Sequence, residues 1–126
     1  MKPLPNQIEE RKASHLQICL DENVQARRAT TGFEDVLLLH KALPEIEREK
    51  IDLSTEVFNH KFAAPIIVGA MTGGTSEAMR INAAIAEAAE ELRLGMGVGS
   101  QRAAIENPRL ERTFSITREK APTAFL

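Results

Sequence analysis

Cysteine is nearly absent from this sequence of 126 residues, which contains only Cys19. A single thiol cannot form a disulfide within the chain. The lack of a disulfide framework is typical of a reducing compartment, so a cytoplasmic protein is predicted. Cys19 shares a helical face with Leu16 and Leu20, which favours a thiol packed in the core over a reactive nucleophile.

A large excess of charge of either sign is also missing, since the formal net charge is -2. Binding to nucleic acid or an anionic membrane through charge requires a clustered basic excess, so neither partner is predicted. The longest apolar run, Phe62 to Met71, is interrupted by Pro65 and Gly69. A membrane-spanning helix needs roughly 20 apolar residues, so no membrane segment is predicted. The N-terminus lacks the apolar core of a signal peptide.

Several familiar site motifs are absent as well. Gly95, Gly97 and Gly99 alternate in the order G-x-G-x-G, which is not the dinucleotide-binding fingerprint, and there is no P-loop lysine motif. The sequence offers no Ser-His-Asp arrangement, zinc-ligand cluster or paired carboxylates. Function must therefore be inferred from strands, loops and scattered cations.

The clearest feature that is present begins with the apolar run Pro65–Val68. A short run bounded by Pro and Gly is typical of a strand buried on both faces. Gly73 and Gly74 follow, and they let the backbone approach a ligand closely. A helical pattern then begins, with Thr75 or Ser76 as its cap. Strand, loop and helix in this order form half of a βαβ unit, in which ligands bind at the loop.

The helix after this loop has apolar residues at spacings of three and four, which predicts one buried face. The predicted buried residues are Ala78, Ile81, Ile85, Ala88 and Leu92. The many alanines among its residues indicate close packing onto a sheet.

A second strand and loop are predicted over residues 94–102. Its alternating glycines would weaken an ordinary strand, but they suit a backbone that lies near a flat ligand or a tight neighbour. Arg102 follows at the carboxyl end of this strand. It could bind a phosphate through two hydrogen bonds, or pair with a nearby glutamate instead.

The first half of the chain is less regular. A helical pattern spans residues 6–20, and one possible buried stripe consists of Ile8, His15, Leu16, Cys19 and Leu20. Arg11, Lys12 and His15 cluster on this helix, where they could bind a diphosphate or a carboxylate, or form a solvated face. Residues 33–40 fit a strand or a short helix, and a strand is favoured.

A β-hairpin is predicted next, from residues 53–58 and 61–63, with Asn59 and His60 as its turn. Such a hairpin could plug the bottom of a barrel. Residues 121–126 predict a further strand at the other end of the chain.

The order from residue 64 onward is therefore strand, helix, strand, short helix, strand, which is typical of a parallel α/β fold. A barrel needs eight strands and typically about 250 residues, so 126 residues hold only its first units. The predicted fold class is the N-terminal part of a (β/α)8 TIM barrel, preceded by a helix and a β-hairpin. We expect residues 1–126 to be a single-domain fragment. Residues 1–63 would form the helix and hairpin, and residues 64–126 the first βα units.

Three motifs occur in a specific order: Arg11-Lys12-x-x-His15-Leu16, Ala70-Met71-Thr72-Gly73-Gly74 and Gly97-x-Gly99-Ser100-Gln101-Arg102. Together they resemble the N-terminal third of the flavin-dependent, type 2 isopentenyl-diphosphate isomerases. The intervening Gly32-Phe33-Glu34-Asp35 and Ala42-Leu43-Pro44-Glu45 are also similar. The resemblance covers essentially the whole chain.

The resemblance implies an enzyme of isoprenoid biosynthesis that interconverts isopentenyl diphosphate and dimethylallyl diphosphate. It implies a barrel that binds FMN at its carboxyl rim, reduced by NADPH or NADH, with Mg2+ accompanying the substrate diphosphate. Because reduced FMN would act as acid and base, no catalytic side chain is expected here. Family members usually assemble as tetramers or octamers. Further contacts, including the metal ligand, would lie beyond Leu126, so the fragment alone is expected to be inactive.

The resemblance also implies roles for individual residues of this chain. The residues expected to line FMN are Ala70, Met71, Thr72 and Ser100. Those expected to hold the substrate, chiefly its diphosphate, are Arg11, Lys12, His15, Ser100, Gln101 and Arg102. No metal ligand is expected within the chain.

Two alternatives stay open from the sequence. One is another FMN-binding barrel, such as an oxidoreductase of hydroxy acids or nucleotides. The Arg-Lys-x-x-His motif argues against it, because this motif suits a small diphosphate. The other is a non-catalytic truncated product whose barrel fragment associates with other chains.

Overall fold

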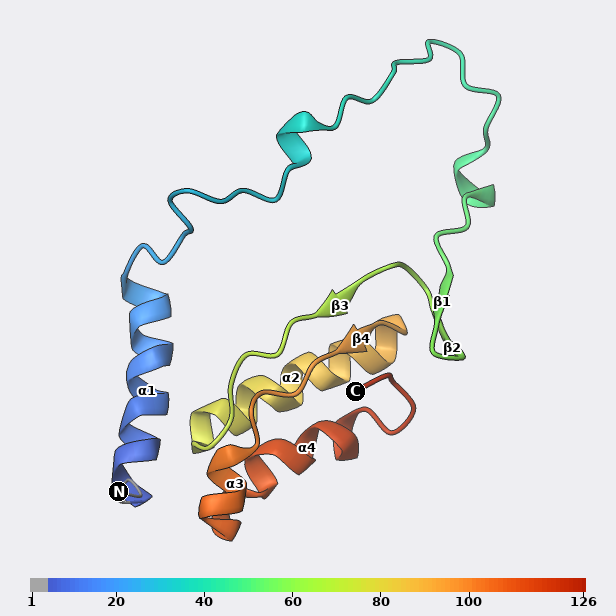
Figure 1. Ribbon diagram of the computed structural model, residues 1–126. Coiled ribbons are helices and arrows are strands. Elements are labelled where there is room, and N and C mark those ends of the chain that lie inside the picture. Colours follow the sequence, from blue (N-terminus) through green and yellow to red (C-terminus); the bar gives the residue numbers. More distant parts are fainter. Residues whose placement is uncertain (1–4) are drawn as a thin grey trace.

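The computed structural model describes residues 5–126, without the side chains of residues 5, 6 and 8, and it has a mixed α/β arrangement (Figure 1). The predicted place of Ile8 in a buried stripe lies outside the described side chains. The helices are α1 (Pro5–Asp21), α2 (Ser76–Leu92), α3 (Arg102–Glu106) and α4 (Arg112–Lys120), with short 3-10 helices at Phe33–Asp35, Arg48–Lys50 and Pro108–Leu110. The strands are β1 (Thr55–Val57), β2 (His60–Phe62), β3 (Ile67–Val68) and β4 (Gly95–Met96).

The ordered body of the chain is built from β3, α2, β4 and α4. β3 and β4 are parallel neighbours, and α2 packs along α4 (Figure 1). A core of mostly small residues lies between these elements, formed by Ala86, Ala89, Met96, Ala121 and Ala124. Small side chains let helices approach closely, so the alanines of α2 set the distance between the two helices.

α2 begins where the sequence predicts. Thr75 is its N-cap, and the Thr75 hydroxyl accepts a hydrogen bond of 3.0 Å from the Ala78 amide. The predicted buried face is only partly right. The buried positions are Ala78, Asn82, Ala86 and Ala89, whereas Ile81 and Ile85 are partly buried and Ala88 and Leu92 are exposed. The closest packing in α2 is made by its smallest side chains, which a pattern based on large apolar residues does not detect.

The predicted strand after Pro65 is shorter and more open than expected. β3 comprises two residues, of which Ile67 is 50% exposed. Burial on both faces is therefore wrong for this chain, since Ile66 is also 51% exposed. Among the described strands, β3 is an edge strand with β4 as its neighbour. The predicted third strand is present as a single parallel bridge between Gly95 and Phe125.

The predicted hairpin is present, with a different turn. β1 pairs antiparallel with β2, and Val57 lies opposite His60. The two turn residues are therefore Phe58 and Asn59, not Asn59 and His60. Their φ angles of 48° and 63° fit the primed turns whose twist matches a hairpin.

The hairpin joins the body through aromatic rings. The Phe62 ring packs edge-on against the Phe125 ring, with centroids 5.6 Å apart. The His60 ring makes a similar contact with Phe125 at 5.4 Å. These contacts place the hairpin beside the amino ends of β3 and β4. The two glycine loops, residues 70–74 and 97–102, follow the opposite ends of these strands.

The turn between α4 and Phe125 is held by two charged side chains. The Arg118 guanidinium donates to the carbonyl oxygens of Ala121, Pro122 and Ala124, at 2.8, 3.1 and 3.0 Å. The Glu90 carboxylate accepts hydrogen bonds from the Thr123 hydroxyl and from the Thr123 and Ala124 amides. The hydrogen bond from the Thr123 hydroxyl is the main cause of a lowered pKa at Glu90.

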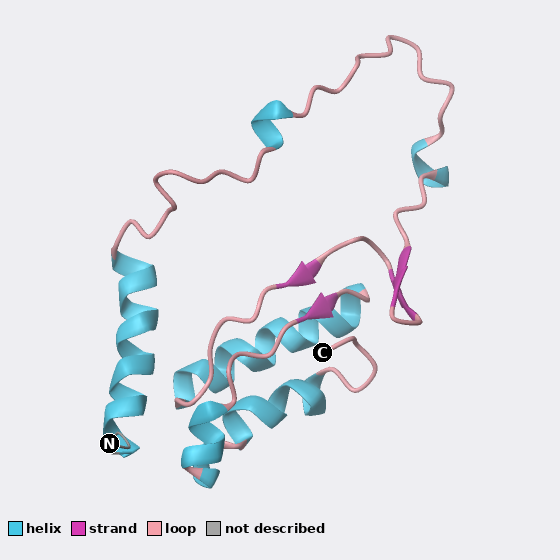
Figure 2. Cartoon of the chain, viewed as in Figure 1, coloured by secondary structure: helices cyan, strands magenta, loops and turns pink. Residues whose placement is uncertain are grey.

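The long connection between α1 and β1 is irregular (Figure 2). The predicted strand over residues 33–40 is wrong: residues 33–35 form a 3-10 turn and the rest is irregular. Leu37, Leu38 and Leu39 are 85%, 85% and 90% exposed. A strand needs a neighbour for its hydrogen bonds, and no described strand pairs with this segment.

α1 confirms the predicted helix but not its predicted buried stripe. Leu16 is partly buried, whereas His15, Cys19 and Leu20 are exposed. The prediction of a packed Cys19 thiol is therefore wrong for this chain. α1 stands at one side of the α2–α4 pair (Figure 1), so the body does not cover a continuous stripe along it.

Candidate functional site

The segments that follow β3 and β4 lie against each other. A Cβ atom on Gly97 would be 2.9 Å from the Ala70 nitrogen, and one on Gly99 would be 2.4 Å from the Thr72 carbonyl oxygen. Such distances leave no room for a side chain. The sequence leaves two explanations open for the alternating glycines, a flat ligand nearby or a tightly packed neighbour. The structure shows the tightly packed neighbour.

At Gly74 the second motif lies close to the first motif and to the residue that follows the third. Its φ of 87° is a left-handed conformation that favours glycine. A Cβ atom placed on Gly74 would lie 3.2 Å from Ala103 Cβ and 3.7 Å from Lys12 Cγ. The structure therefore brings the N-terminal helix, the glycine loop and the residue after Arg102 together at one place.

Two buried polar side chains form hydrogen bonds to the backbone of the glycine loop. The Asn82 amide nitrogen donates to the carbonyl oxygens of Thr72 and Thr113, at 3.2 and 2.9 Å. The Thr113 hydroxyl accepts a 2.8 Å hydrogen bond from the Gly74 amide and donates to the Leu110 carbonyl. Sequence reasoning missed both residues. The available signal was an asparagine on the otherwise alanine-rich face of α2.

The predicted flavin residues differ in exposure. Ala70 and Ser100 are exposed, and Met71 is 64% exposed. Thr72 is buried at 5% exposure, against the second strand segment. Apolar side chains therefore lie open on the loop, while the residue next to the glycines anchors it.

The predicted substrate residues come from two sides of the loop. Lys12 is partly buried next to Gly74, and Arg11 and His15 are exposed on the same helix. Arg102 is exposed, and its Nε donates to Glu106 at 2.8 Å, which is the glutamate pairing that the sequence leaves open. This bond uses Nε, so it does not involve the two terminal guanidinium nitrogens.

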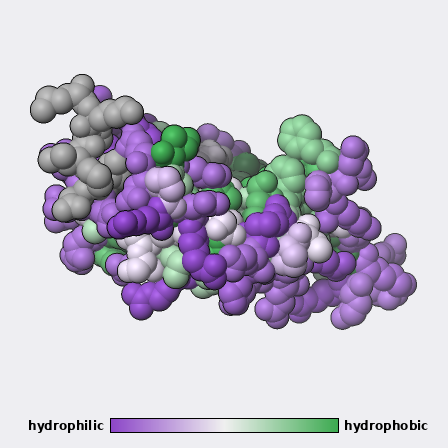
Figure 3. All heavy atoms as spheres, turned by 90° about the horizontal axis from the view of Figure 1, so that it is seen from below, coloured by the Kyte–Doolittle hydropathy of each residue, from purple (hydrophilic) through white to green (hydrophobic). Residues whose placement is uncertain are grey.

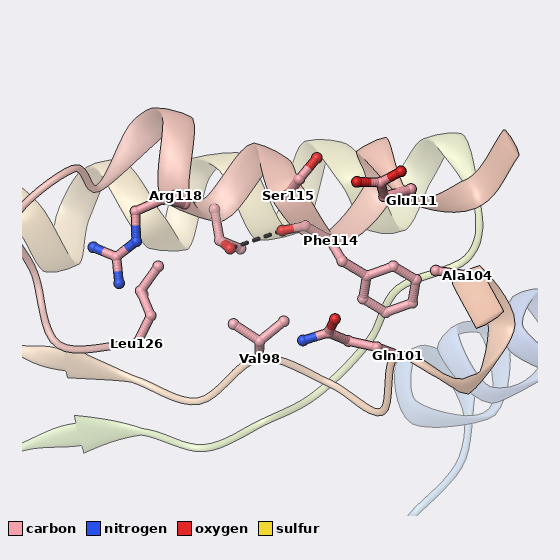
Figure 4. A pocket seen from close by; sticks show the side chains of 9 residues that line it. Val98, Gln101, Ala104, Glu111, Phe114, Ser115, Arg118 and Leu126 are labelled. Atoms are coloured by element: carbon pink, nitrogen blue, oxygen red, sulfur yellow. Dashed lines mark hydrogen bonds between the residues drawn. The ribbon is translucent and has the colours of Figure 1, made fainter. Parts of the chain in front are cut away.

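A cavity of about 470 Å³ opens between the end of β4 and α4 (Figure 4). It is lined by Val98, Gln101, Ala104, Glu111, Phe114, Ser115, Thr117, Arg118 and Leu126. Figure 4 shows the Gln101 side chain beneath the Phe114 ring, on the strand side of this cavity. The cavity thus lies between the helix and strand layers, and the Phe114 ring that lines it also packs against Gly73 of the loop. We assign it to packing and not to the candidate site.

One face of the molecule is mostly hydrophilic, with smaller apolar areas between (Figure 3). Among the helices of residues 5–126, none is long and apolar enough to span a membrane. Within the same residues, no three His, Cys, Asp or Glu side chains come together as metal ligands would.

Comparison with known proteins gives two findings. Residues 5–113 match the profile of the FMN-dependent dehydrogenase family. The chain is also similar to proteins named isopentenyl-diphosphate delta-isomerase. It is 52% identical over 116 residues to that of Methanococcoides burtonii, covering 92% of this chain and 32% of the relative.

Two further proteins of the same name are similar to this chain. Identity is 53% to the Archaeoglobus fulgidus protein and 45% to the Methanothermobacter thermautotrophicus protein, covering 92% and 94% of this chain and 33% and 34% of the relatives. The chain therefore spans about a third of the length of the curated relatives that it matches. These similarities confirm the resemblance predicted from the three sequence motifs.

Proposed function

Because this chain belongs to the FMN-dependent dehydrogenase family, we propose that it forms the N-terminal part of a (β/α)8 barrel that binds FMN. In this proposal residues 64–126 are the first βα units, and residues 1–63 supply the helix and the hairpin that precede them. The parallel order of β3, β4 and the Phe125 bridge supports it. So does the position of both glycine segments after the carboxyl ends of their strands, where barrel enzymes bind ligands.

The proposed activity of the full-length protein is the interconversion of isopentenyl diphosphate and dimethylallyl diphosphate, in isoprenoid biosynthesis. The names of the relatives suggest it. The observation that supports it best is at Gly74, where a Cβ atom would lie 3.7 Å from Lys12 Cγ of the first motif and 3.2 Å from Ala103 Cβ, directly after the third motif. The ammonium group that ends the Lys12 side chain could bind an anionic substrate beside this loop.

The residues at the loop fit a flavin. A flat ring system needs close approach of the backbone and apolar contacts, and the exposed Ala70 and Met71 side chains beside a tightly paired backbone offer both. We propose that Ala70, Met71, Thr72 and Ser100 hold FMN. When bound in reduced form, FMN would supply the acid and base chemistry that these residues lack.

The remaining polar residues would hold the diphosphate. The aliphatic part of the Lys12 side chain lies next to Gly74, and Arg11 and His15 lie on the same helix. Arg102 can use its terminal guanidinium nitrogens for a phosphate while Nε stays bound to Glu106. Ser100 and Gln101 complete the proposed substrate set, and the Gln101 side chain lines the cavity beneath Phe114.

Further properties of this enzyme follow from the resemblance alone and are proposed with it. They are reduction of FMN by NADPH, Mg2+ bound with the substrate diphosphate, assembly into a tetramer or octamer, and a cytoplasmic location. No Mg2+ ligand is proposed among residues 1–126.

The test is anaerobic incubation of the full-length protein with FMN, NADPH, Mg2+ and isopentenyl diphosphate. Formation of dimethylallyl diphosphate is expected. A second candidate is an FMN-dependent oxidoreductase, which the name of the matching family favours. Loss of the flavin colour with a 2-hydroxy acid, without any isomerisation, would establish that candidate and refute the isomerase.

A further inference from the structure

Two buried polar residues, Asn82 and Thr113, form hydrogen bonds to the backbone of the glycine loop. Asn82 has the largest fully buried side chain in the described part of the chain, and its residue exposure is 2%. A buried amide needs partners, and the Asn82 amide nitrogen has two, the carbonyls of Thr72 and Thr113. The side chain therefore bridges the loop to the start of α4.

Thr113 forms the second hydrogen-bonded link to the loop. Its hydroxyl accepts the Gly74 amide at 2.8 Å and donates to the Leu110 carbonyl at 2.6 Å, and the residue is 7% exposed. The Thr113 hydroxyl thus acts as both donor and acceptor, and the two hydrogen bonds fix its orientation. A valine of the same shape could form neither bond.

These bonds determine which backbone groups of the loop face inward. The Thr72 carbonyl points to Asn82, and the Gly74 amide points to Thr113. The peptide planes on either side of Gly73 are therefore set by α2 and α4. Ala70 and Met71 immediately precede these fixed planes and are exposed.

We propose that Asn82 and Thr113 are positioning residues, which hold residues 72–74 in the one conformation that presents Ala70 and Met71 to FMN. This inference rests on the proposed function. The bound conformation of a loop that is free to rearrange is only partly populated, and the apparent affinity falls by that fraction. Neither residue contacts the flavin in this arrangement, so their effect on it passes through the loop backbone.

The test compares FMN binding with stability in the full-length protein. Thr113→Val removes the hydroxyl at nearly constant shape, Thr113→Ser keeps it, and Asn82→Ala removes the amide. Ala86→Gly is the matched control, because Ala86 is fully buried on α2 but packs in the alanine core. Fluorescence titration gives the FMN dissociation constant, and thermal unfolding gives Tm.

Thr113→Val and Asn82→Ala should weaken FMN binding about tenfold or more, the loss expected for one hydrogen bond. Thr113→Ser should bind within about twofold of the unsubstituted protein, because it retains the hydroxyl. Ala86→Gly should lower Tm with little change in FMN affinity. Hydrogen exchange should show lost protection of the Gly74 amide in Thr113→Val and no loss in Ala86→Gly.

Unchanged FMN affinity in Thr113→Val, or an equal loss in Ala86→Gly at the same Tm, would overturn the positioning role. If Asn82→Ala does not fold, the valine and serine pair still decides the outcome. Failure of the unsubstituted protein to bind FMN would instead refute the proposed function, and the inference would fall with it.

Discussion

Gly99 lies so close to Thr72 that a Cβ atom on residue 99 would be 2.4 Å from the Thr72 carbonyl oxygen. This contact is between two backbones, so neither side can give way by rotating a side chain. It is the tightest link between the two loops that carry the proposed FMN residues.

Gly99→Ala should destabilise the full-length protein by about 1–3 kcal/mol, the usual cost of overpacking, and should weaken FMN binding because the loops must separate. Gly69→Ala is the control, since a Cβ there meets nothing within 4 Å. Chemical denaturation and flavin titration measure both effects. Similar results for the two variants would contradict the tight pairing of the loops.

Arg102→Ala should raise the KM for isopentenyl diphosphate far more than it raises the dissociation constant of FMN. Its exposed pair with Glu106 should contribute at most about 1 kcal/mol to stability. Glu106→Gln is the companion variant, because it breaks the pair and keeps the guanidinium. Parallel losses of substrate and FMN binding in Arg102→Ala would mean that Arg102 is structural.

Thr75→Ala should cost about 1 kcal/mol of stability, because it removes the side chain that accepts the Ala78 amide at the start of α2. Thr75→Ser retains the hydroxyl and should be close to neutral. Urea unfolding followed by circular dichroism checks this. A neutral alanine variant would show that the cap does not contribute.

Acid should weaken the turn that follows α4. The pKa of Glu90 is lowered from its usual 4.5, chiefly by the hydrogen bond from the Thr123 hydroxyl. A lowered carboxyl pKa adds stability above the unfolded value, and this stability is lost as the pH falls through the folded value. Between pH 7 and the region below 4.5, Glu90→Gln should therefore show a shallower loss of stability than the unsubstituted protein. Denaturant midpoints across this range, with Glu91→Gln as an exposed control, measure the difference.

Local chemistry was enough to predict several elements. The cap at Thr75 and the strand, loop and helix order around Gly74 depend on neighbouring residues, and the structure has both. The hairpin was also predicted, with its turn displaced by one residue because Phe58 adopts a positive φ that its residue type disfavours.

Features that depend on distant partners were not predictable. The leucines at 37–39 fit a strand only if another strand pairs with them. Cys19 and Leu20 fit a core only if something covers α1. At the candidate site, the role of Thr113 could not be predicted, because its partner, the Gly74 amide, is 39 positions away along the sequence.

The turn held by Arg118 and Glu90 has a consequence for how a sheet would be completed. It directs Phe125 alongside β4. The next strand of the sheet therefore lies on the side of β4 that faces away from β3. β3 then keeps a free edge, beside the half-exposed Ile66 and Ile67. In a closed barrel the last strand must return to that edge. The seam of the barrel would then run along β3, the strand that leads into the flavin loop, so closure and cofactor binding would depend on the same few residues.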